Sequence, residues 1–266
     1  MSWWGKMIGG TFGFMIGGPL GALLGAAIGH NFDKGLNSFD MPGVGDQERV
    51  QTVFFTATFS VMGHIAKADG QVTKDEIAMA RNVFAHMQLN EEQRKAAMAL
   101  FNEGKVDNFP LDAVLEQLVR ECHRRNTLLQ MFVEIQLNAA WADGEIHPNE
   151  RAILEKIAAR LGIPKFIMQR LDALAQAQAR HQAQARHQAH QPATPKNSLK
   201  EAYKILGITP EDDQKTITRA YRKLMNQHHP DKLVSKGLPE EMMKLATEKT
   251  QEIRGAYEII KNARGF

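Results

Sequence analysis

The sequence predicts an all-α protein: an N-terminal single transmembrane helix, a helical bundle, a flexible linker and a C-terminal helical hairpin. Three observations support this prediction. Residues 7–29 carry no charged side chain, and apolar residues recur at helical spacing through residues 46–172. No stretch alternates apolar and polar residues as a half-buried strand does.

The composition fits more than one domain and argues against a secreted protein held by disulfides. The chain has 266 residues, of which 43% are hydrophobic, and its 33 basic and 30 acidic side chains leave a net charge of +3. This length exceeds the usual size of one core, and the small net charge does not indicate a nucleic-acid partner. The only cysteine, Cys122, cannot form an internal disulfide, which fits a reducing compartment. We expect a buried structural thiol there, and we expect no cofactor.

Residues 1–6 form a short tail ahead of a predicted transmembrane helix at residues 7–29. As a helix, this uncharged stretch is roughly 34 Å long, enough to cross a hydrocarbon core of about 30 Å. Trp3, Trp4 and Lys6 stand just outside it, where aromatic and basic side chains favour the membrane interface. The alternatives are a cleaved signal peptide, whose apolar core is shorter, and a flexible arm, which needs no regular glycine spacing. We therefore expect an uncleaved anchor in the lipid bilayer.

Glycine recurs at every fourth position of this stretch. Such a stripe lacks side chains and lets a second helix backbone approach closely, which is how G-x-x-x-G helices pair in membranes. The sequence therefore predicts a homodimer held through the transmembrane helix. The glycines of the stripe are Gly9, Gly13, Gly17, Gly21, Gly25 and Gly29.

Residues 46–172 are predicted to form one helical bundle. Two passages inside it match, because Ala-Asp-Gly stands at residues 68–70 and again at residues 142–144, 74 residues further on. Each passage follows one helical stretch and precedes another, and Asp-Gly favours a turn. Paired turns of this kind in an all-helical domain resemble the TerB-like (tellurite-resistance B) family. We expect a duplicated helix-turn-helix unit.

Acidic residues near the two turns form a candidate metal site. In TerB-like domains such residues are suspected of holding a cation, and the resemblance carries this role onto Asp69, Glu76, Asp143 and Glu150. Neither turn has the ligand spacing of an EF-hand. The alternative is structural, since Thr73 and Glu76 have the spacing of a capping box at a helix start. We prefer the structural interpretation.

The composition changes in the linker at residues 173–198. The run AQAQARHQAQARHQAHQPATPKNS has no large apolar face and contains two prolines near its end. A stretch of this kind is typical of a solvated tether, partly helical at most. Its histidines are not held by any rigid element, so we do not expect a metal site there.

Residues 199–266 carry the most specific motif in the chain. A short apolar helix ends at Gly207, and a longer amphipathic helix is predicted over Gln214–His228. Pro230 stops that helix, because proline drives the residue before it out of the α region. A third helix follows. The segments AYKILGI, ITRAYRKLMNQHHPDK and EIRGAYEII, with His-Pro-Asp at the end of a basic helix, resemble the J-domain family.

The resemblance implies a docking site for the ATPase domain of an Hsp70. In the family, the His-Pro-Asp corner contacts the partner near its interdomain linker and promotes ATP hydrolysis there. The corner is His229, Pro230 and Asp231, and the helix-surface residues expected to dock with it are Tyr221, Arg222, Lys223 and Arg219. This chain departs from the family pattern in a loop, residues 233–239, that is longer than usual.

The order of anchor, TerB-like bundle, linker and J-domain resembles membrane-anchored DnaJ-like co-chaperones of bacteria. This resemblance implies a single-pass protein of the inner membrane whose C-terminal bulk faces the cytoplasm, where the Hsp70 DnaK and ATP are found. It also implies a regulatory role linked to envelope and capsule signalling. Local charges around residues 7–29 lean toward the opposite orientation, and we give the J-domain more weight.

Two other functions are weighed against the co-chaperone. An enzyme using His228, His229 and Asp231 is disfavoured, because no second cluster of chemically suited residues completes a site. We expect no catalytic residue. A dimeric membrane scaffold or sensor acting through the TerB-like domain, with metal bound there, stays open as the second hypothesis.

Overall fold

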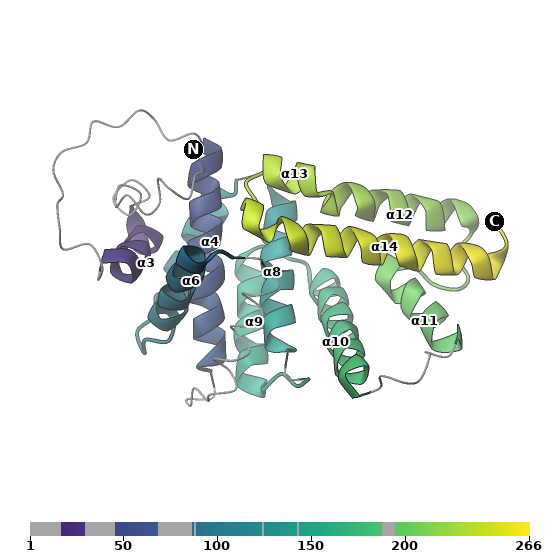
Figure 1. Cartoon of the computed structure of the whole chain (residues 1–266), viewed down its shortest axis with the longest axis horizontal. Coiled ribbons are helices and arrows are strands. Elements are labelled where there is room, and N and C mark those ends of the chain that lie inside the picture. Colours follow the sequence, from purple (N-terminus) through teal and green to yellow (C-terminus); the bar gives the residue numbers. More distant parts are fainter. Residues whose placement is uncertain are drawn as a thin grey trace.

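The computed structural model of the chain describes residues 17–29, 46–68, 87, 89–123, 125–142, 144–187 and 195–266. Every regular element in these residues is a helix, which confirms the predicted all-α fold. The helices form a bundle with a long helical hairpin lying along one side of it (Figure 1). Residues 69–86, which include the candidate ligands Asp69 and Glu76, lie outside the described residues.

The bundle is built around α4 (Asp46–Ala66), which is surrounded by other helices and is buried on all its faces from Val50 to Gly63. Its neighbours are α6 (Glu91–Gly104), α7 (Leu111–Glu121), α8 (Asn126–Ala140) and α9 (Pro148–Arg160). A helix that is apolar all round is stable only in such a central position, because each face needs a packing partner. Phe54 on α4 meets Phe132 on α8 edge to face, with ring centroids 6.0 Å apart.

Helices α4 and α6 approach so closely that their backbones touch. A Cβ atom on Gly63 would lie 1.9 Å from the carbonyl oxygen of Phe101, and one on Gly104 would lie 1.8 Å from the carbonyl oxygen of Ser60. Neither distance is compatible with a side chain. The two glycines therefore set the distance between the central helix and α6.

The described part of the predicted transmembrane segment is α3 (Gly18–Gly29), which packs against the bundle. Leu20 and Leu24 are buried there, and the Leu20 amide donates a 2.9 Å hydrogen bond to Oε1 of Gln117 on α7. The helix begins at Gly18 because Gly17 and Gly18 have positive φ angles and Pro19 suits a first helical turn. In the residues that the structure describes, no helix is both long and apolar enough to cross a bilayer.

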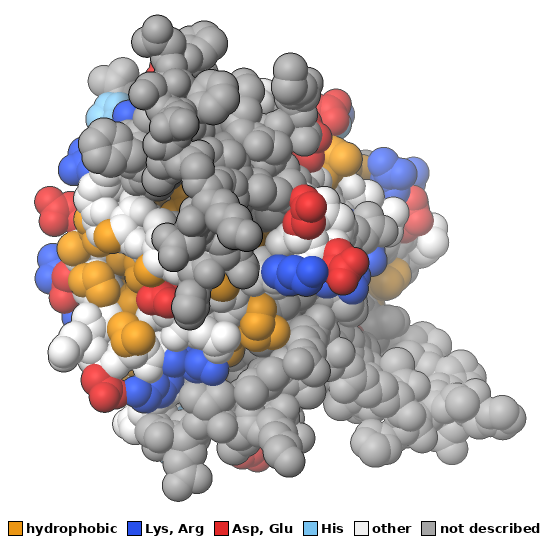
Figure 2. All heavy atoms as spheres, turned by 60° about the vertical axis from the view of Figure 1, so that its left-hand side comes forward, with side chains coloured by type: hydrophobic (Ala, Val, Ile, Leu, Met, Phe, Trp, Pro, Cys, Tyr) orange, Lys and Arg blue, Asp and Glu red, His pale blue; other side chains and the backbone are white. Residues whose placement is uncertain are grey.

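Figure 2 turns the side of the molecule with α3 and α6 toward the viewer. Hydrophobic side chains show on this face among basic and acidic ones, and much of the view is taken up by residues that are not described. Of the predicted glycine stripe, Gly17, Gly21, Gly25 and Gly29 lie in the described residues, whereas Gly9 and Gly13 lie outside them. A Cβ atom on Gly25 would meet nothing within 4 Å.

The last helix of the bundle, α10 (Lys165–His187), continues into the predicted linker. It is fastened to the bundle by Asp172, which accepts hydrogen bonds of 2.8 Å from the indole of Trp141 and 2.8 Å from Arg151. The linker predicted at residues 173–198 is thus helical as far as His187, and Leu174 and Ala175 within it are buried. Alanine, glutamine and arginine favour a helix, which accounts for the extension. Residues 188–194 lie outside the described part.

The C-terminal hairpin consists of α12 (Gln214–His228) and α14 (Met243–Arg264), antiparallel and side by side, with α11 (Pro195–Leu206) packed across them (Figure 1). These helices agree with the predicted J-domain hairpin. They share an apolar core made by Ala202, Tyr203, Leu206, Ile217, Leu224, Ile253, Ala256 and Ile260. Two short elements were not expected: α13 (Pro230–Ser235) and a 3-10 turn, η1 (Glu240–Met242), which connect α12 to α14.

Substitution of Gly63 tests the contact between α4 and α6. Gly63→Ala should lower the free energy of unfolding by about 1–3 kcal/mol, because the new methyl group displaces the Phe101 backbone in a packed core. Gly255→Ala is the matched control, since a Cβ there meets nothing within 4 Å and alanine favours the helix by about 0.5–1 kcal/mol. Urea unfolding of both variants checks the prediction, and an unchanged midpoint for Gly63→Ala would contradict it.

Candidate functional site

The His-Pro-Asp motif forms a sharp corner between two helices. His229 closes α12 and opens α13 with an extended backbone, φ −60° and ψ 124°. Pro230 is the first residue of α13, where its lack of an N–H costs nothing, and its ring keeps His229 out of the helical region. The Leu233 amide donates a 3.0 Å hydrogen bond to the His229 carbonyl and completes the first turn. One proline thus fixes the angle between α12 and α13.

The polar side chains of the corner are open to solvent. The His229 side chain is 47% exposed and the Asp231 side chain is 85% exposed, with 3.9 Å between Nδ1 and Oδ2. That separation is too long for a hydrogen bond. Both side chains are therefore accessible to a partner at the turn between α12 and α13.

Exposed basic side chains lie along α12 beside the corner. Ile217 and Leu224 on the opposite side of this helix are buried in the hairpin core. The helix is started by Asp213, whose carboxylate accepts a 2.8 Å hydrogen bond from the Thr216 amide. Hydrogen bonds from Thr216 hold the pKa of that carboxyl below its ordinary value. The exposed basic residues are Lys215, Arg219, Arg222 and Lys223.

Tyr221 is placed differently from its basic neighbours. Its ring stacks on Tyr257 of α14, with centroids 4.2 Å apart and an angle of 14° between the planes. The residue is half-buried, so part of its surface stabilises the hairpin and the rest is exposed to solvent. The predicted docking residues Arg219, Arg222, Lys223 and His229 share the open side of α12 and its end.

Of the candidate metal ligands, Asp69, Glu76 and Asp143 lie outside the described residues. Glu150 is the third residue of α9, where its carboxylate accepts a 2.9 Å hydrogen bond from the His147 amide. His147 in turn accepts from the Asn149 amide, which completes a capping box at the start of the helix. Among the described residues, no group of three or more histidine, cysteine or acidic side chains is placed to hold a metal ion.

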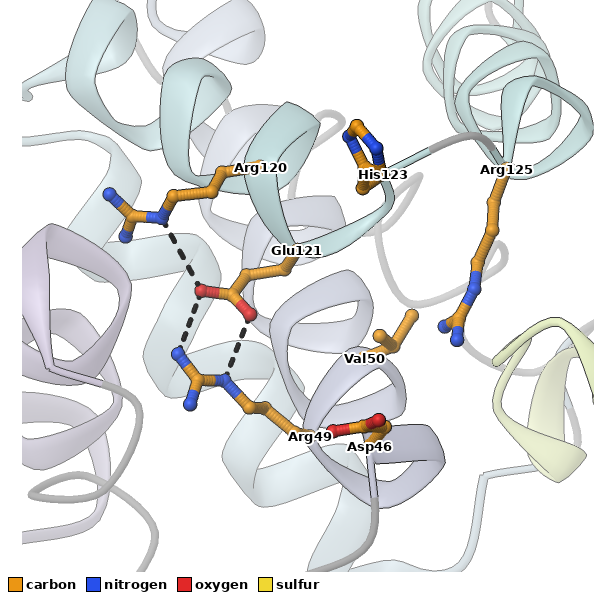
Figure 3. A pocket seen from close by; sticks show the side chains of 7 residues that line it. All are labelled: Asp46, Arg49, Val50, Arg120, Glu121, His123 and Arg125. Atoms are coloured by element: carbon orange, nitrogen blue, oxygen red, sulfur yellow. Dashed lines mark hydrogen bonds and ion pairs between the residues drawn. The ribbon is translucent and has the colours of Figure 1, made fainter.

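A hollow of about 430 Å³ lies where α4 begins and α7 ends (Figure 3). Three of the charged side chains that line it, those of Arg49, Arg120 and Glu121, are paired with one another. Glu121 accepts two hydrogen bonds from Arg49, of 2.8 and 2.9 Å, and Arg120 lies 3.6 Å from the same carboxylate. Cys122 follows directly but is buried, and burial raises the pKa of its thiol to about 12. The thiol is therefore structural, as expected from the sequence.

A buried group of charges behind the corner was not predicted. Lys249 of α14 lies 2.7 Å from Glu134 of α8 and 3.2 Å from Glu252, and the side chains of Lys249 and Glu134 are only 9% and 7% exposed. Burial alone would lower the pKa of Lys249, but the Glu134 and Glu252 carboxylates outweigh it and raise the pKa. The one sequence signal for this group was the carboxylate of Glu134 within the mostly apolar stretch at residues 131–137. Its partner lies too far along the chain for periodicity to find.

His228, the residue before the corner, reaches the same group. Burial lowers the pKa of its imidazole, while the Glu134 carboxylate opposes that effect. Its Nδ1 atom is buried and makes no hydrogen bond to any described residue. Burial thus outweighs the Glu134 carboxylate, and the pKa of the His228 imidazole lies below its ordinary value.

Three family models match the chain. The model described as the co-chaperone DjlA transmembrane domain matches residues 1–39, that of tellurite resistance protein TerB matches residues 55–173, and that of the DnaJ domain matches residues 201–264. These matches confirm the predicted kinds and order of the parts. No solved structure matches the chain.

Curated relatives are similar over the whole length. The co-chaperone protein DjlA of Vibrio parahaemolyticus is 47% identical, and the match covers 100% of both chains. The DjlA proteins of Escherichia coli K12 and Photorhabdus laumondii are 45% and 43% identical, again over 100% of each chain.

The lowered pKa of His228 predicts a loss of stability in mild acid. The unfolded chain takes up a proton near pH 6.5, whereas the folded chain does so only at lower pH. The contribution of His228 to the free energy of unfolding is therefore complete above about pH 6.5. It decreases as the pH falls toward the pKa of the folded state, by at most about 1.4 kcal/mol per pH unit for one proton.

His228→Gln should remove this contribution. Urea unfolding between about pH 8 and about pH 5 should give a shallower pH dependence than in the unsubstituted chain. His123→Gln, at an exposed histidine, is the control for the substitution itself. Equal slopes for the unsubstituted chain and His228→Gln would show that folding does not lower the pKa of His228.

Proposed function

The chain belongs to the DjlA family of J-domain co-chaperones, and on that premise we propose that it stimulates ATP hydrolysis by an Hsp70 of the DnaK type. Co-chaperones of this kind are regulatory proteins rather than enzymes, and a DnaJ domain implies an Hsp70 partner. The observation that carries the proposal is the proline-fixed corner, with His229 and Asp231 exposed at the end of the basic helix α12.

The basic face of α12 suits the approach to an acidic partner surface. Exposed charges beside a docking point accelerate encounter and fix orientation more than they add to final affinity. Arg219, Arg222 and Lys223 are all exposed on the helix that ends at the corner. We infer that these side chains orient the corner on the ATPase domain.

The hydrolytic chemistry belongs to the partner. A bound protein shifts a conformational equilibrium only by the difference between its affinities for the two states. The corner therefore acts by binding more tightly to the conformation of Hsp70 that is poised for hydrolysis. A rigid corner is suited to this task, because little conformational freedom is lost when it binds.

The similarity of residues 1–39 to the DjlA transmembrane domain supports an anchor in the inner membrane. We propose that residues 7–29 cross the bilayer once and leave the C-terminal bulk in the cytoplasm, where DnaK and ATP are. In the bilayer, Leu20 and Leu24 exchange their contacts with α6 and α7 for contacts with lipid tails, which are equally apolar. The glycine stripe then faces a second copy of the chain.

We propose a regulatory rather than a general role for this co-chaperone, linked to envelope and capsule signalling. Full-length similarity to DjlA proteins supports it. The bundle is the part suited to receive a signal, since it lies between the anchor and the J-domain.

The test of the proposed function is a single-turnover ATPase assay with DnaK. His229→Gln should abolish stimulation while leaving the fold intact, because the imidazole is 47% exposed and forms no short contact with Asp231. His123→Gln makes the same change at an exposed histidine of the bundle and should stimulate normally. Normal stimulation by His229→Gln would instead favour a membrane scaffold acting through the TerB-like bundle.

The homodimer is tested in the bilayer. Gly17→Leu combined with Gly21→Leu should greatly reduce chemical crosslinking between two copies in vesicles, because leucine side chains keep the helices apart. Leu20→Ile combined with Leu24→Ile keeps the glycine stripe and should crosslink as before. Undiminished crosslinking of the glycine variant would show that the stripe is not the contact.

A further inference from the structure

The C-terminal hairpin is joined to the bundle by the segment that links α12 to α14. Its apolar residues pack in the core of the bundle rather than in the core of the hairpin. Leu233, Leu238 and Met242 of this segment, together with Ala246 in the first turn of α14, are fully buried there. The loop at residues 233–239 is therefore part of the interface between the hairpin and the bundle.

Hydrogen bonds fix the same segment to the bundle. Gln47 and Gln51 of α4 donate to the carbonyls of Val234 and Leu238, at 3.1 and 3.4 Å. Lys236 donates a 3.1 Å hydrogen bond to the hydroxyl of Thr127 on α8. The polar groups of the loop are thus matched to partners on two bundle helices.

Close packing reinforces these bonds. A Cβ atom on Gly237 would lie 2.5 Å from Cγ1 of Val50, and Gly237 has a φ of +102° that other residues rarely adopt. At the other end of the interface, Arg170 of α10 donates a 3.2 Å hydrogen bond to the Ile205 carbonyl. The hairpin is therefore held at both ends, and we call the bundle surface beneath it the seat, defined by Val50, Thr127, Glu134 and Arg170.

The centre of the seat is the ion pair between Glu134 and Lys249, 2.7 Å long and almost fully buried. Loss of one partner from such a pair is strongly unfavourable, because the remaining charge is left in a poorly solvated site. The best-attested use of a buried pair is to select one relative placement of the elements it joins. Here it joins α8 of the bundle to α14 of the J-domain.

The seat also reaches the backbone of the corner. His228 stands next to His229 in the chain, and its mostly buried imidazole faces Glu134 and Arg170 from the bundle and Lys249 and Glu252 from α14. The last residue of α12 is thus half-buried beside charged residues of both the bundle and α14. The residue that follows it begins the docking corner.

The seat leaves the docking side of the J-domain uncovered. Arg219, Arg222 and Lys223 are exposed on α12, and His229 and Asp231 are exposed at the corner. The bundle therefore holds the hairpin from behind. Its contacts present the corner to a partner and do not block it.

We propose that Glu134 is a positioning residue for Hsp70 stimulation, which acts through Lys249 and His228 to hold the His-Pro-Asp corner in the orientation that docks. This inference rests on the proposed function and adds that the TerB-like bundle is part of the active unit. When only a fraction of molecules is competent to bind, the apparent dissociation constant rises by the inverse of that fraction, while the bound complex is unchanged. Loss of the seat should therefore weaken binding and leave the maximal rate intact.

The test compares variants of the full chain in bilayer nanodiscs in a single-turnover DnaK ATPase titration. Glu134→Gln should raise the concentration for half-maximal stimulation by about tenfold, with the same maximal rate, if about a tenth of the molecules stay competent. Glu134→Gln combined with Lys249→Met removes both charges at similar volume and should bring that concentration back to within about threefold of the unsubstituted chain.

Glu121→Gln is the matched control, because Glu121 is also an ion-paired, mostly buried carboxylate of the bundle, but its partner Arg49 belongs to the bundle helix α4 and not to the hairpin. It should leave the titration unchanged. Hydrogen exchange of residues 230–246, measured without DnaK, should be faster in Glu134→Gln and slower again in the double variant. Rescue by the double variant distinguishes positioning from a general loss of packing.

The outcomes distinguish a failure of the proposed co-chaperone function from a failure of the positioning role of Glu134. If the unsubstituted chain fails to accelerate DnaK, the proposed function is wrong and the positioning role is wrong with it. If the chain stimulates and Glu134→Gln stimulates at the same concentration, Glu134 has no positioning role although the co-chaperone function stands. Stimulation by Glu134→Gln at a lower concentration would overturn the inference as well, because the seat would then restrain the corner.

Discussion

The angle at His229 depends on a single steric constraint. Pro230 cannot continue α12, and its ring keeps the preceding residue extended, so the chain turns within one residue and starts α13 at once. This backbone conformation sets the relative positions of the exposed His229 imidazole and Asp231 carboxylate. The basic side chains of α12 then stand beside the corner because the opposite side of that helix is needed for the hairpin core.

The two halves of the molecule are joined more firmly than their separate cores suggest. The hairpin has its own apolar core, yet the segment after the corner is buried with the residues of the bundle. A charge buried in such an interface needs a partner in a fixed place, and Glu134 supplies one for Lys249. The bundle is therefore more than a spacer between the bilayer and the J-domain. Its surface sets how the corner is presented.

Much of this organisation was predictable from local sequence signals. The bounds of α12 follow from its periodicity and from Pro230, and the start of α9 follows from Pro148. The extension of α10 was missed because an alanine- and glutamine-rich stretch without an apolar face predicts a tether as readily as a helix. The pair of Glu134 and Lys249 could not be found, since it joins helices more than a hundred residues apart in the sequence. The sequence marked the loop at residues 233–239 as a departure from the J-domain pattern. In the structure Gly237 of this loop packs closely against Val50 of the bundle, a contact that local sequence signals could not predict.

The central claim is that this corner changes the turnover of a nucleotide-hydrolysing partner. The most direct measurement is a single round of ATP hydrolysis by DnaK with increasing amounts of the full chain in nanodiscs. The account predicts a rate that rises with the chain and reaches a plateau, and that falls when salt screens the basic face of α12. A hydrolysis rate that stays at its basal value with folded chain in excess would contradict the account.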